Sequence, residues 1–132
     1  MSTLLVVDDD PEVCSILAEA LGKGGYKVVQ AAHVSEANAK LGQQRFDCIL
    51  TDLYLGKGDG GQLIASLRLG RGLNCKTPVL LMSAHLEIGV IKKLRPMVSG
   101  VLVKPFDMKT LLSRISEVLG LEPQSQAQTK AA

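Results

Sequence analysis

Short apolar runs alternate with segments of helical periodicity along almost the whole chain. Runs such as Leu4–Val7 and Pro78–Met82 are continuously apolar, which is typical of strands buried on both faces of a parallel sheet. The predicted strands are Leu4–Val7, Tyr26–Ala31, Cys48–Thr51, Pro78–Met82 and Val101–Val103. The predicted helices are Pro11–Leu21, Ser35–Leu41, Gln62–Leu69, Leu86–Leu94 and Met108–Leu119. The pattern is five strand–helix units in strict alternation.

Helix boundaries are marked by capping residues and glycines. Asp10 offers a side-chain acceptor at an N-cap, and Pro11 suits the first helical position. Gly22, Gly24 and Gly25 are predicted to end the first helix, and Gly42 the second. The glycine-rich segment Gly56–Gly61 is predicted to be a loop without regular structure.

This alternation predicts a single α/β domain. Parallel strands need right-handed crossovers, which place helices on both faces of one sheet, so we expect a doubly wound α/β sandwich. A chain of 132 residues fits one domain, for which we expect the bounds 1–121. The Gln-, Ser- and Ala-rich tail, 122–132, is expected to be disordered.

Polar residues fall at the carboxyl ends of four of the five predicted strands. Asp8 and Asp9 follow the first strand, and Asp52 follows the third. Ser83 ends the fourth strand and Lys104 ends the fifth. The functional crevice of a doubly wound sheet lies at this edge, so we expect these five side chains to share one site.

The chemistry of that site follows from its residue types. Two carboxylates about 4 Å apart repel each other by roughly 4 kcal/mol at a surface-like dielectric, and a hard divalent cation removes that repulsion. Asp8, Asp9 and Asp52 therefore predict a Mg²⁺ site. Lys104 adds a positive charge and Ser83 a hydroxyl, a combination that suits phosphoryl transfer with a carboxylate as nucleophile. The sequence has no Walker A or GxGxxG motif, so the phosphoryl group is expected to come from another molecule.

Charge and hydropathy exclude other classes of function. The net charge of +2 and the absence of a Lys/Arg run argue against direct nucleic-acid binding. The densest basic stretch, Lys92, Lys93 and Arg95, is interpreted as the solvated face of a helix. No apolar stretch approaches the length of a membrane span, and the acidic start MSTLLVVDDD does not fit a signal peptide, so we expect a cytoplasmic protein without membrane association.

Four segments closely resemble the signature blocks of response-regulator receiver domains from bacterial two-component systems. They are LLVVDDDPEV, FDCILTDLYLGKGDG, PVLLMSAH and GVLVKPF, and the resemblance runs from Leu4 to about Leu119. It implies a flavodoxin-like fold with strand order 2-1-3-4-5 and a cis bond between Lys104 and Pro105.

The resemblance also implies a role for each site residue. Asp52 would be the phosphoacceptor and Asp9 a direct Mg²⁺ ligand, while Asp8 would act through a metal-bound water. The backbone carbonyl of Tyr54 would supply a further metal ligand. Ser83 would bond a phosphoryl oxygen, and Lys104 would form an ion pair with the phosphate.

The family is a switch and not a conventional enzyme: it catalyses only its own phosphorylation and dephosphorylation. The donor would be a phosphohistidine on a sensor histidine kinase or a histidine phosphotransfer protein. A surface around helix four, strand five and helix five would then bind a downstream effector, an output domain or a second copy of the domain. The chain departs from the family at Leu55-Gly56, where Leu/Met-Pro is common, and at Val101, where an aromatic switch residue is usual.

The sequence argues against two other functions. A Mg²⁺-dependent phosphohydrolase with an aspartyl nucleophile needs a second acid two residues after the nucleophile, and position 54 is Tyr. A flavodoxin-like cofactor binder needs a Ser/Thr/Gly-rich phosphate loop after the first strand, where this chain has three aspartates. Tyr54 and His85 are expected to flank the approach of water to the phosphoacceptor, with His85 favoured as a bystander.

Overall fold

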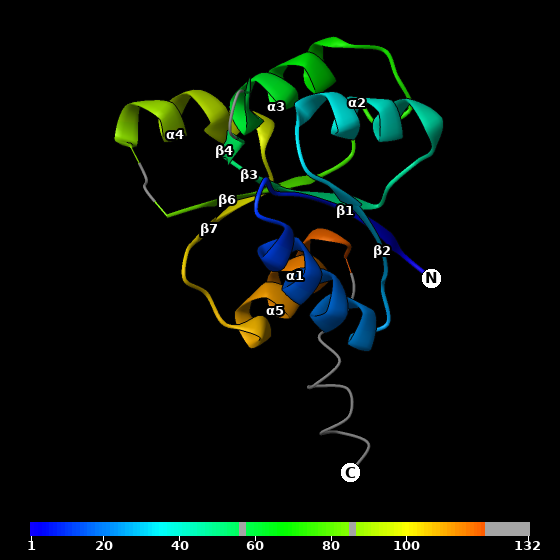
Figure 1. Cartoon of the computed structure of the whole chain (residues 1–132). Helices are drawn as coiled ribbons and strands as arrows, with labels where there is room; N and C mark the ends of the chain where they lie inside the picture. Colours follow the sequence, from blue (N-terminus) through cyan, green and yellow to red (C-terminus); the bar gives the residue numbers. More distant parts are fainter. Residues whose placement is uncertain (56–57, 85–86, 121–132) are drawn as a thin grey trace.

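The computed structural model describes residues 1–55, 58–84 and 87–120, and its centre is a five-stranded parallel sheet (Figure 1). The strand order is β2-β1-β3-β6-β7, all neighbours being parallel. These strands are β1 (Thr3–Val7), β2 (Lys27–Ala31), β3 (Cys48–Asp52), β6 (Val79–Ser83) and β7 (Gly100–Val103). Counted along the chain, this is the predicted order 2-1-3-4-5. The labels differ because a short antiparallel pair, β4 (Tyr54–Leu55) and β5 (Gly58–Asp59), lies between β3 and the next helix.

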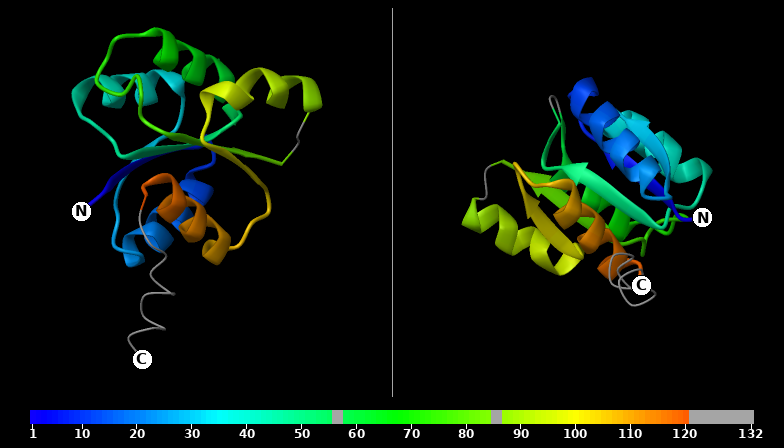
Figure 2. Two further views of the ribbon diagram at one scale, coloured as in Figure 1. Left: turned by 180° about the vertical axis from the view of Figure 1, so that it is seen from behind. Right: turned by 90° about the horizontal axis from the view of Figure 1, so that it is seen from below.

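Five α-helices cover the two faces of the sheet (Figures 1 and 2). They are α1 (Pro11–Lys23), α2 (Val34–Gln43), α3 (Gly60–Leu69), α4 (Ile88–Leu94) and α5 (Met108–Val118). Helices α2, α3 and α4 lie on one face, and α1 and α5 on the other. A 3₁₀ turn at Arg95–Met97, which the sequence did not predict, extends α4. None of the helices in the described residues is long and apolar enough to cross a membrane.

The core consists of two apolar clusters, one on each face of the sheet. Strand β1 contributes to both: Leu5 and Val7 join one cluster, and Leu4 and Val6 join the other. All four of these side chains are fully buried. Burial on both faces explains why β1 is continuously apolar, and it fixes the strand ends that carry the polar residues.

The glycines predicted to end the first helix do so, because α1 stops at Lys23 and Gly24 is its C-cap. Two other predictions about glycines were wrong. Gly42 lies inside α2, which continues to Gln43. The segment predicted as a loop includes the strand Gly58–Asp59, and α3 begins at Gly60; Gly56 and Lys57 lie outside the described residues, as does the tail 122–132. A glycine inside a helix costs about 1 kcal/mol relative to alanine, which the burial of neighbours such as Leu21 and Leu41 outweighs.

Candidate functional site

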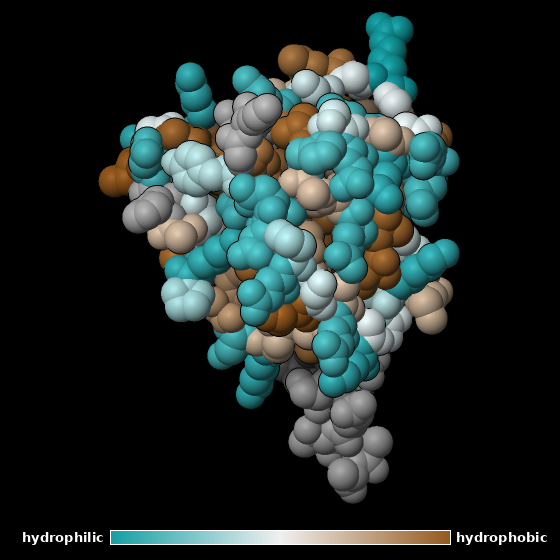
Figure 3. All heavy atoms as spheres, viewed as in Figure 1, coloured by the Kyte–Doolittle hydropathy of each residue, from teal (hydrophilic) through white to brown (hydrophobic). Residues whose placement is uncertain are grey.

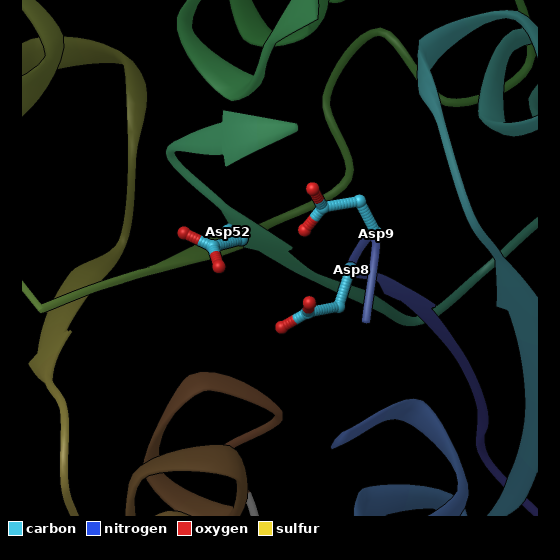
Figure 4. Close-up of side chains that lie close together, drawn as sticks. All are labelled: Asp8, Asp9 and Asp52. Atoms are coloured by element: carbon cyan, nitrogen blue, oxygen red, sulfur yellow. The ribbon is translucent and has the colours of Figure 1, made fainter. Parts of the chain in front are cut away.

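Three carboxylates meet at the carboxyl edge of the sheet (Figure 4). Asp8 and Asp9 directly follow β1, and Asp52 is the last residue of β3. These strands are neighbours with Val7 opposite Thr51, so the residues that follow come together. One oxygen atom from each carboxylate lies within 4.8 Å of the others. Hydrophilic side chains gather at the middle of this face, over the end of β1 (Figure 3).

Lys104, the residue that follows β7, forms ion pairs with two of these carboxylates. Its Nζ lies 2.7 Å from Oδ2 of Asp52 and 3.1 Å from Oδ2 of Asp8. The backbone N–H of Lys104 donates to the carbonyl of Ser83 at 2.8 Å, which extends the pairing of β7 with β6. The bond from Lys104 to Pro105 is cis, as the resemblance implied. The ammonium is therefore fixed between the two acids by the strand that carries it.

Backbone donors orient the same two carboxylates. The N–H of Asp10 donates to Oδ1 of Asp8 at 2.9 Å, and the N–H of Tyr54 donates to Oδ1 of Asp52 at 3.2 Å. Each carboxylate thus has one oxygen on a backbone N–H and the other on Lys104. Charge-assisted hydrogen bonds of this kind fix the orientation of a carboxylate as well as its charge.

Burial changes the acidity of the site. Asp8 is 1% exposed, and desolvation raises its pKa above the usual range, although the hydrogen bonds from Asp10 and Lys104 act in the opposite direction. Desolvation lowers the pKa of Lys104, but hydrogen bonds to Asp52 and Asp8 outweigh this, and the net shift is upward. Lys104 is therefore a permanent cation, and the ionised form of Asp8 is destabilised by the fold.

Ser83 and Tyr54 flank this cluster. Ser83 is the last residue of β6, between the strands that carry Asp52 and Lys104, and it is fully buried. Tyr54 begins β4, two residues after Asp52; its side chain is 46% exposed, and its hydroxyl lies 3.5 Å from Oε1 of Glu87. His85 lies outside the described residues.

Asp10 is the neighbouring acid that does not join the cluster. Its side chain accepts the N–H of Glu12 at 2.9 Å and caps α1, as predicted. This capping role makes Asp10 a natural control for Asp8 and Asp9, because it carries the same charge beside the site.

Gly60 supports the site in a way that the sequence analysis missed. It is the first residue of α3, and its N–H donates to the carbonyl of Leu53 at 2.7 Å. A Cβ atom at this position would overlap the backbone carbonyl oxygen of Asp52. The start of α3 is therefore packed directly on the backbone of the strand end that holds Asp52, and only glycine fits there. The available signal was a glycine eight residues after Asp52, inside the segment Gly56–Gly61 that is predicted to be a loop.

The donor set fits a hard divalent cation. Three carboxylates and one ammonium give the cluster a formal charge of −2. All the acidic ligand atoms are oxygens, which Mg²⁺ prefers, and a divalent charge matches the excess. The site also holds a fixed cation and an oriented carboxylate, the parts that phosphoryl transfer to an aspartate needs.

The chain is similar to proteins of one known family. A family model described as the response regulator receiver domain matches residues 4–116. The transcriptional regulatory protein ZraR of Escherichia coli (strain K12) is 33% identical over 129 residues, which is 97% of this chain and 29% of ZraR. The chain therefore spans less than a third of that relative.

Solved structures give the same result. Chemotaxis protein CheY4 of Vibrio cholerae matches with a TM-score of 0.83 and 29% identity, over 89% of this chain and 98% of that one. The receiver domain of sensor histidine kinase PA1611 from Pseudomonas aeruginosa matches with a TM-score of 0.80 and 25% identity, over 90% and 98%. That structure has a magnesium ion coordinated in its active-site cleft.

Proposed function

The chain belongs to the response regulator receiver domain family, whose members act by phosphorylation-dependent switching, and from this we propose that Asp52 is the residue that receives the phosphoryl group. The observation that carries the assignment is the bridge from Lys104 to Asp52 and Asp8 beside a third carboxylate, Asp9. It combines the nucleophile, the fixed cation and the acidic ligand set in one place.

Asp52 is suited to act as the nucleophile. One of its oxygens is held by the N–H of Tyr54, and the other lies against the ammonium of Lys104. In the proposed reaction an oxygen of Asp52 bonds to phosphorus while the bond from phosphorus to the donor's imidazole nitrogen breaks. The imidazole keeps the electron pair and takes a proton. The donor is a phosphohistidine on a sensor kinase or a phosphotransfer protein.

Asp8, Asp9 and Asp52, with the carbonyl of Tyr54, are the residues that would hold Mg²⁺. Bound there, the cation would neutralise the excess negative charge and that of the incoming phosphoryl group. In the assignment that the resemblance implies, Asp9 is the direct ligand and Asp8 acts through water. The exposure of Asp9 and the full burial of Asp8 agree with this division.

Lys104 and Ser83 would respond to the new phosphoryl group. Phosphorylation adds a charge of about −1.5 to −2, so the ammonium of Lys104 would exchange an Asp52 oxygen for a phosphoryl oxygen. Ser83 would direct its hydroxyl to another. Because Ser83 ends β6, its movement acts on the start of the connection to α4, whereas Lys104 follows β7 and its movement acts on the connection to α5.

The output surface is proposed to consist of α4, β7 and α5. Ile88 on α4 is 75% exposed and Val103 on β7 is 49% exposed, so this surface presents apolar side chains to a partner. The partner would be a downstream effector, an output domain or a second copy of the chain. Val101 is partly buried against the core and stands where the family usually has an aromatic ring, so we propose that movement of α4 replaces the usual ring movement.

No comparison supports the phosphohydrolase alternative. Position 54 would need a general acid–base, and the structure has a tyrosine there whose hydroxyl contacts Glu87. The reactions of this domain would then be limited to gaining and losing its own phosphoryl group.

The assignment is tested by phosphorylation with a small donor such as acetyl phosphate. The wild-type chain should gain an acyl phosphate only when Mg²⁺ is present, measured by intact mass spectrometry under conditions that preserve the bond. Asp52→Asn should abolish the reaction because an amide is not a nucleophile, and Asp9→Asn should weaken it through loss of a metal ligand.

Asp10→Asn is the matched control, because it removes the same charge beside the site and asparagine caps a helix equally well. It should be phosphorylated like the wild type. Acyl phosphate in Asp52→Asn, or metal-independent phosphorylation of the wild type, would contradict the assignment.

A further inference from the structure

A hollow of about 530 Å³ lies at the amino ends of β3 and β6, which carry Asp52 and Ser83 at their other ends. Its lining comes from the segment after α2 and the segment after α3, which run side by side (Figure 2, left). Strand β3 has five residues, so the hollow lies roughly 17 Å from Asp52 along the strand. It is a separate place on the molecule from the acidic cluster.

One buried side chain, Asn74, joins the two segments that line this hollow. Asn74 is 1% exposed, and its Oδ1 accepts from the backbone N–H of Phe46 at 2.8 Å and from the hydroxyl of Thr77 at 2.9 Å. Its Nδ2 donates to the carbonyls of Leu41 and Gln44, both at 2.8 Å. This amide fastens both lining segments to each other, so the hollow is formed before any ligand arrives.

The rim of the hollow is cationic. Arg45, Arg71 and Lys76 line it and are exposed, and no hydrogen bond or ion pair engages their side chains within the part of the chain that the structure describes. Asp47 is the only carboxylate among the lining residues, and it accepts the backbone N–H of Thr3 at 2.7 Å. The three cationic side chains and the carboxylate of Asp47 give the lining a formal charge of +2, which a bound anion would neutralise.

The lining also offers apolar surface for the body of a ligand. Leu73 and Pro78 supply this surface: Leu73 is 46% exposed and Pro78 is half-buried, whereas Phe46 is almost fully buried behind them. Small-molecule sites typically measure about 300–1,000 Å³ and combine apolar walls with a few placed polar groups. Guanidinium groups pair with phosphate and carboxylate through two parallel hydrogen bonds, which adds geometric selectivity to the charge.

We propose that this hollow binds a small organic polyanion, whose phosphate or carboxylate groups pair with Arg45, Arg71 and Lys76. The body of the ligand packs on Leu73 and Pro78. Two sources have this chemistry, nucleotides and polycarboxylates, and both place at least two anionic groups on a compact body. The proposal does not depend on the role of Asp52, because the lining shares no residue with the acidic cluster.

Chemical-shift titration of the isotope-labelled chain tests the proposal. The probes are ADP, citrate and inorganic pyrophosphate, each in the presence of EDTA so that metal at the acidic cluster plays no part. We expect saturable shifts at residues 45–47 and 71–78, with a Kd below about 1 mM for ADP or citrate. Tighter binding of ADP than citrate assigns the nucleotide source, and the reverse order assigns the polycarboxylate source. The absence of saturation for both up to about 10 mM, or the tightest binding by pyrophosphate, would overturn the proposal.

Two triple variants with the same loss of charge distinguish binding in the hollow from nonspecific electrostatic attraction to the protein. Arg45→Gln/Arg71→Gln/Lys76→Gln should weaken binding by more than about tenfold, because it removes the pairing groups. Lys92→Gln/Lys93→Gln/Arg95→Gln removes the same charge from the exposed side of α4 and its 3₁₀ extension, and should change affinity less than about twofold. Equal losses in the two triple variants would show that no site exists.

A third variant tests the shape of the hollow without changing its charge. Gly72 lines it, and a Cβ atom there would meet no other atom within 4 Å, so Gly72→Trp can fill the space while the chain folds. Affinity for the tighter probe should fall by more than about fivefold, with the thermal unfolding midpoint unchanged. Undiminished binding in this variant would contradict a ligand seated in the hollow.

Discussion

Replacing Asp8 with Asn should stabilise the metal-free protein. At an effective dielectric of about 20, two unit charges 4.8 Å apart repel by about 3.5 kcal/mol, and Asp8 faces two carboxylates within that distance. Its attraction to Lys104 at 3.1 Å is about 5 kcal/mol on the same scale, so attraction offsets most of the repulsion, and the loss of hydration on burial is what makes the ionised form of Asp8 unfavourable and raises its pKa. Solvent weakens the repulsion from exposed Asp9, and the substitution loses about one hydrogen bond.

The expected gain is about 1–2 kcal/mol, or a rise of about 4–8 °C in the thermal unfolding midpoint in EDTA near pH 7.5. The pKa of Asp8 sets the pH dependence. Because the fold raises this pKa, protonated Asp8 favours the native state, and that contribution is present below about pH 4 and lost as the pH rises through the raised value. The difference in unfolding midpoint between Asp8→Asn and the wild type should therefore be largest at pH 7.5 and should shrink as the pH falls toward 4.

Magnesium should reverse the order. At a hundred times its Kd, a cation that binds only the native state stabilises that state by about 2.7 kcal/mol. The wild type should gain this stabilisation, which exceeds the advantage of the variant, and the variant should largely lack it. Circular dichroism melts in EDTA and in Mg²⁺ measure both effects, and Asp10→Asn should melt within about 1 °C of the wild type. A destabilised Asp8→Asn in EDTA at pH 7.5, or an advantage that does not change with pH, would refute the electrostatic reasoning.

Three further predictions test the surroundings of the site. Gly60→Ala should lower the thermal unfolding midpoint by about 8 °C and slow phosphorylation, because its Cβ atom overlaps the backbone carbonyl of Asp52. As the control, Gly42→Ala meets no atom within 4 Å and should raise the midpoint by about 2–4 °C. Similar midpoints for the two variants would contradict the close approach of Gly60 to Asp52. Tyr54→Ala, alone and with His85→Ala, should change the decay rate of the acyl phosphate several-fold without changing Mg²⁺ affinity. The reason is that the position of the attacking water relative to the phosphorus atom controls that rate. An unchanged decay rate would show that neither side chain affects the approach of water. Gly89→Ala should stiffen α4 and reduce the change in its amide hydrogen exchange on addition of beryllofluoride. Phosphorylation of Asp52 should be retained in this variant. If the amides of α4 exchange as slowly as those of α5 both with and without beryllofluoride, α4 is not the element that moves.

The positions of the site residues could be predicted from the sequence because each follows an apolar strand. Burial on both faces makes β1 and β3 continuously apolar, so the first polar residue marks the strand end, and parallel topology brings Asp8 and Asp52 to one edge. The helix start at Asp10 could be predicted for a similarly local reason, since its own side chain makes the cap.

Features that depend on two distant segments could not be predicted in the same way. The close approach of Gly60 to Asp52 depends on where α3 packs, and a glycine in a glycine-rich segment carries no sign of it. Asn74 joins residues about 30 positions away, and a lone asparagine in a loop has no distinguishing pattern. Gly42 does not end α2 because local propensity is weak beside the tertiary packing of that helix.

The bridge made by Lys104 has a consequence for protein synthesis. Lys104 is 96 residues from Asp8 and 52 from Asp52, so the ammonium and its two acids meet only after almost the whole domain has left the ribosome and closed its sheet. A nascent chain still lacking β7 has the acids without their cation. Contacts of such long range form late in folding, so competence for phosphorylation should appear together with the complete native state. Incomplete translation products and misfolded copies would then not be phosphorylated, and only completely folded molecules would carry the signal.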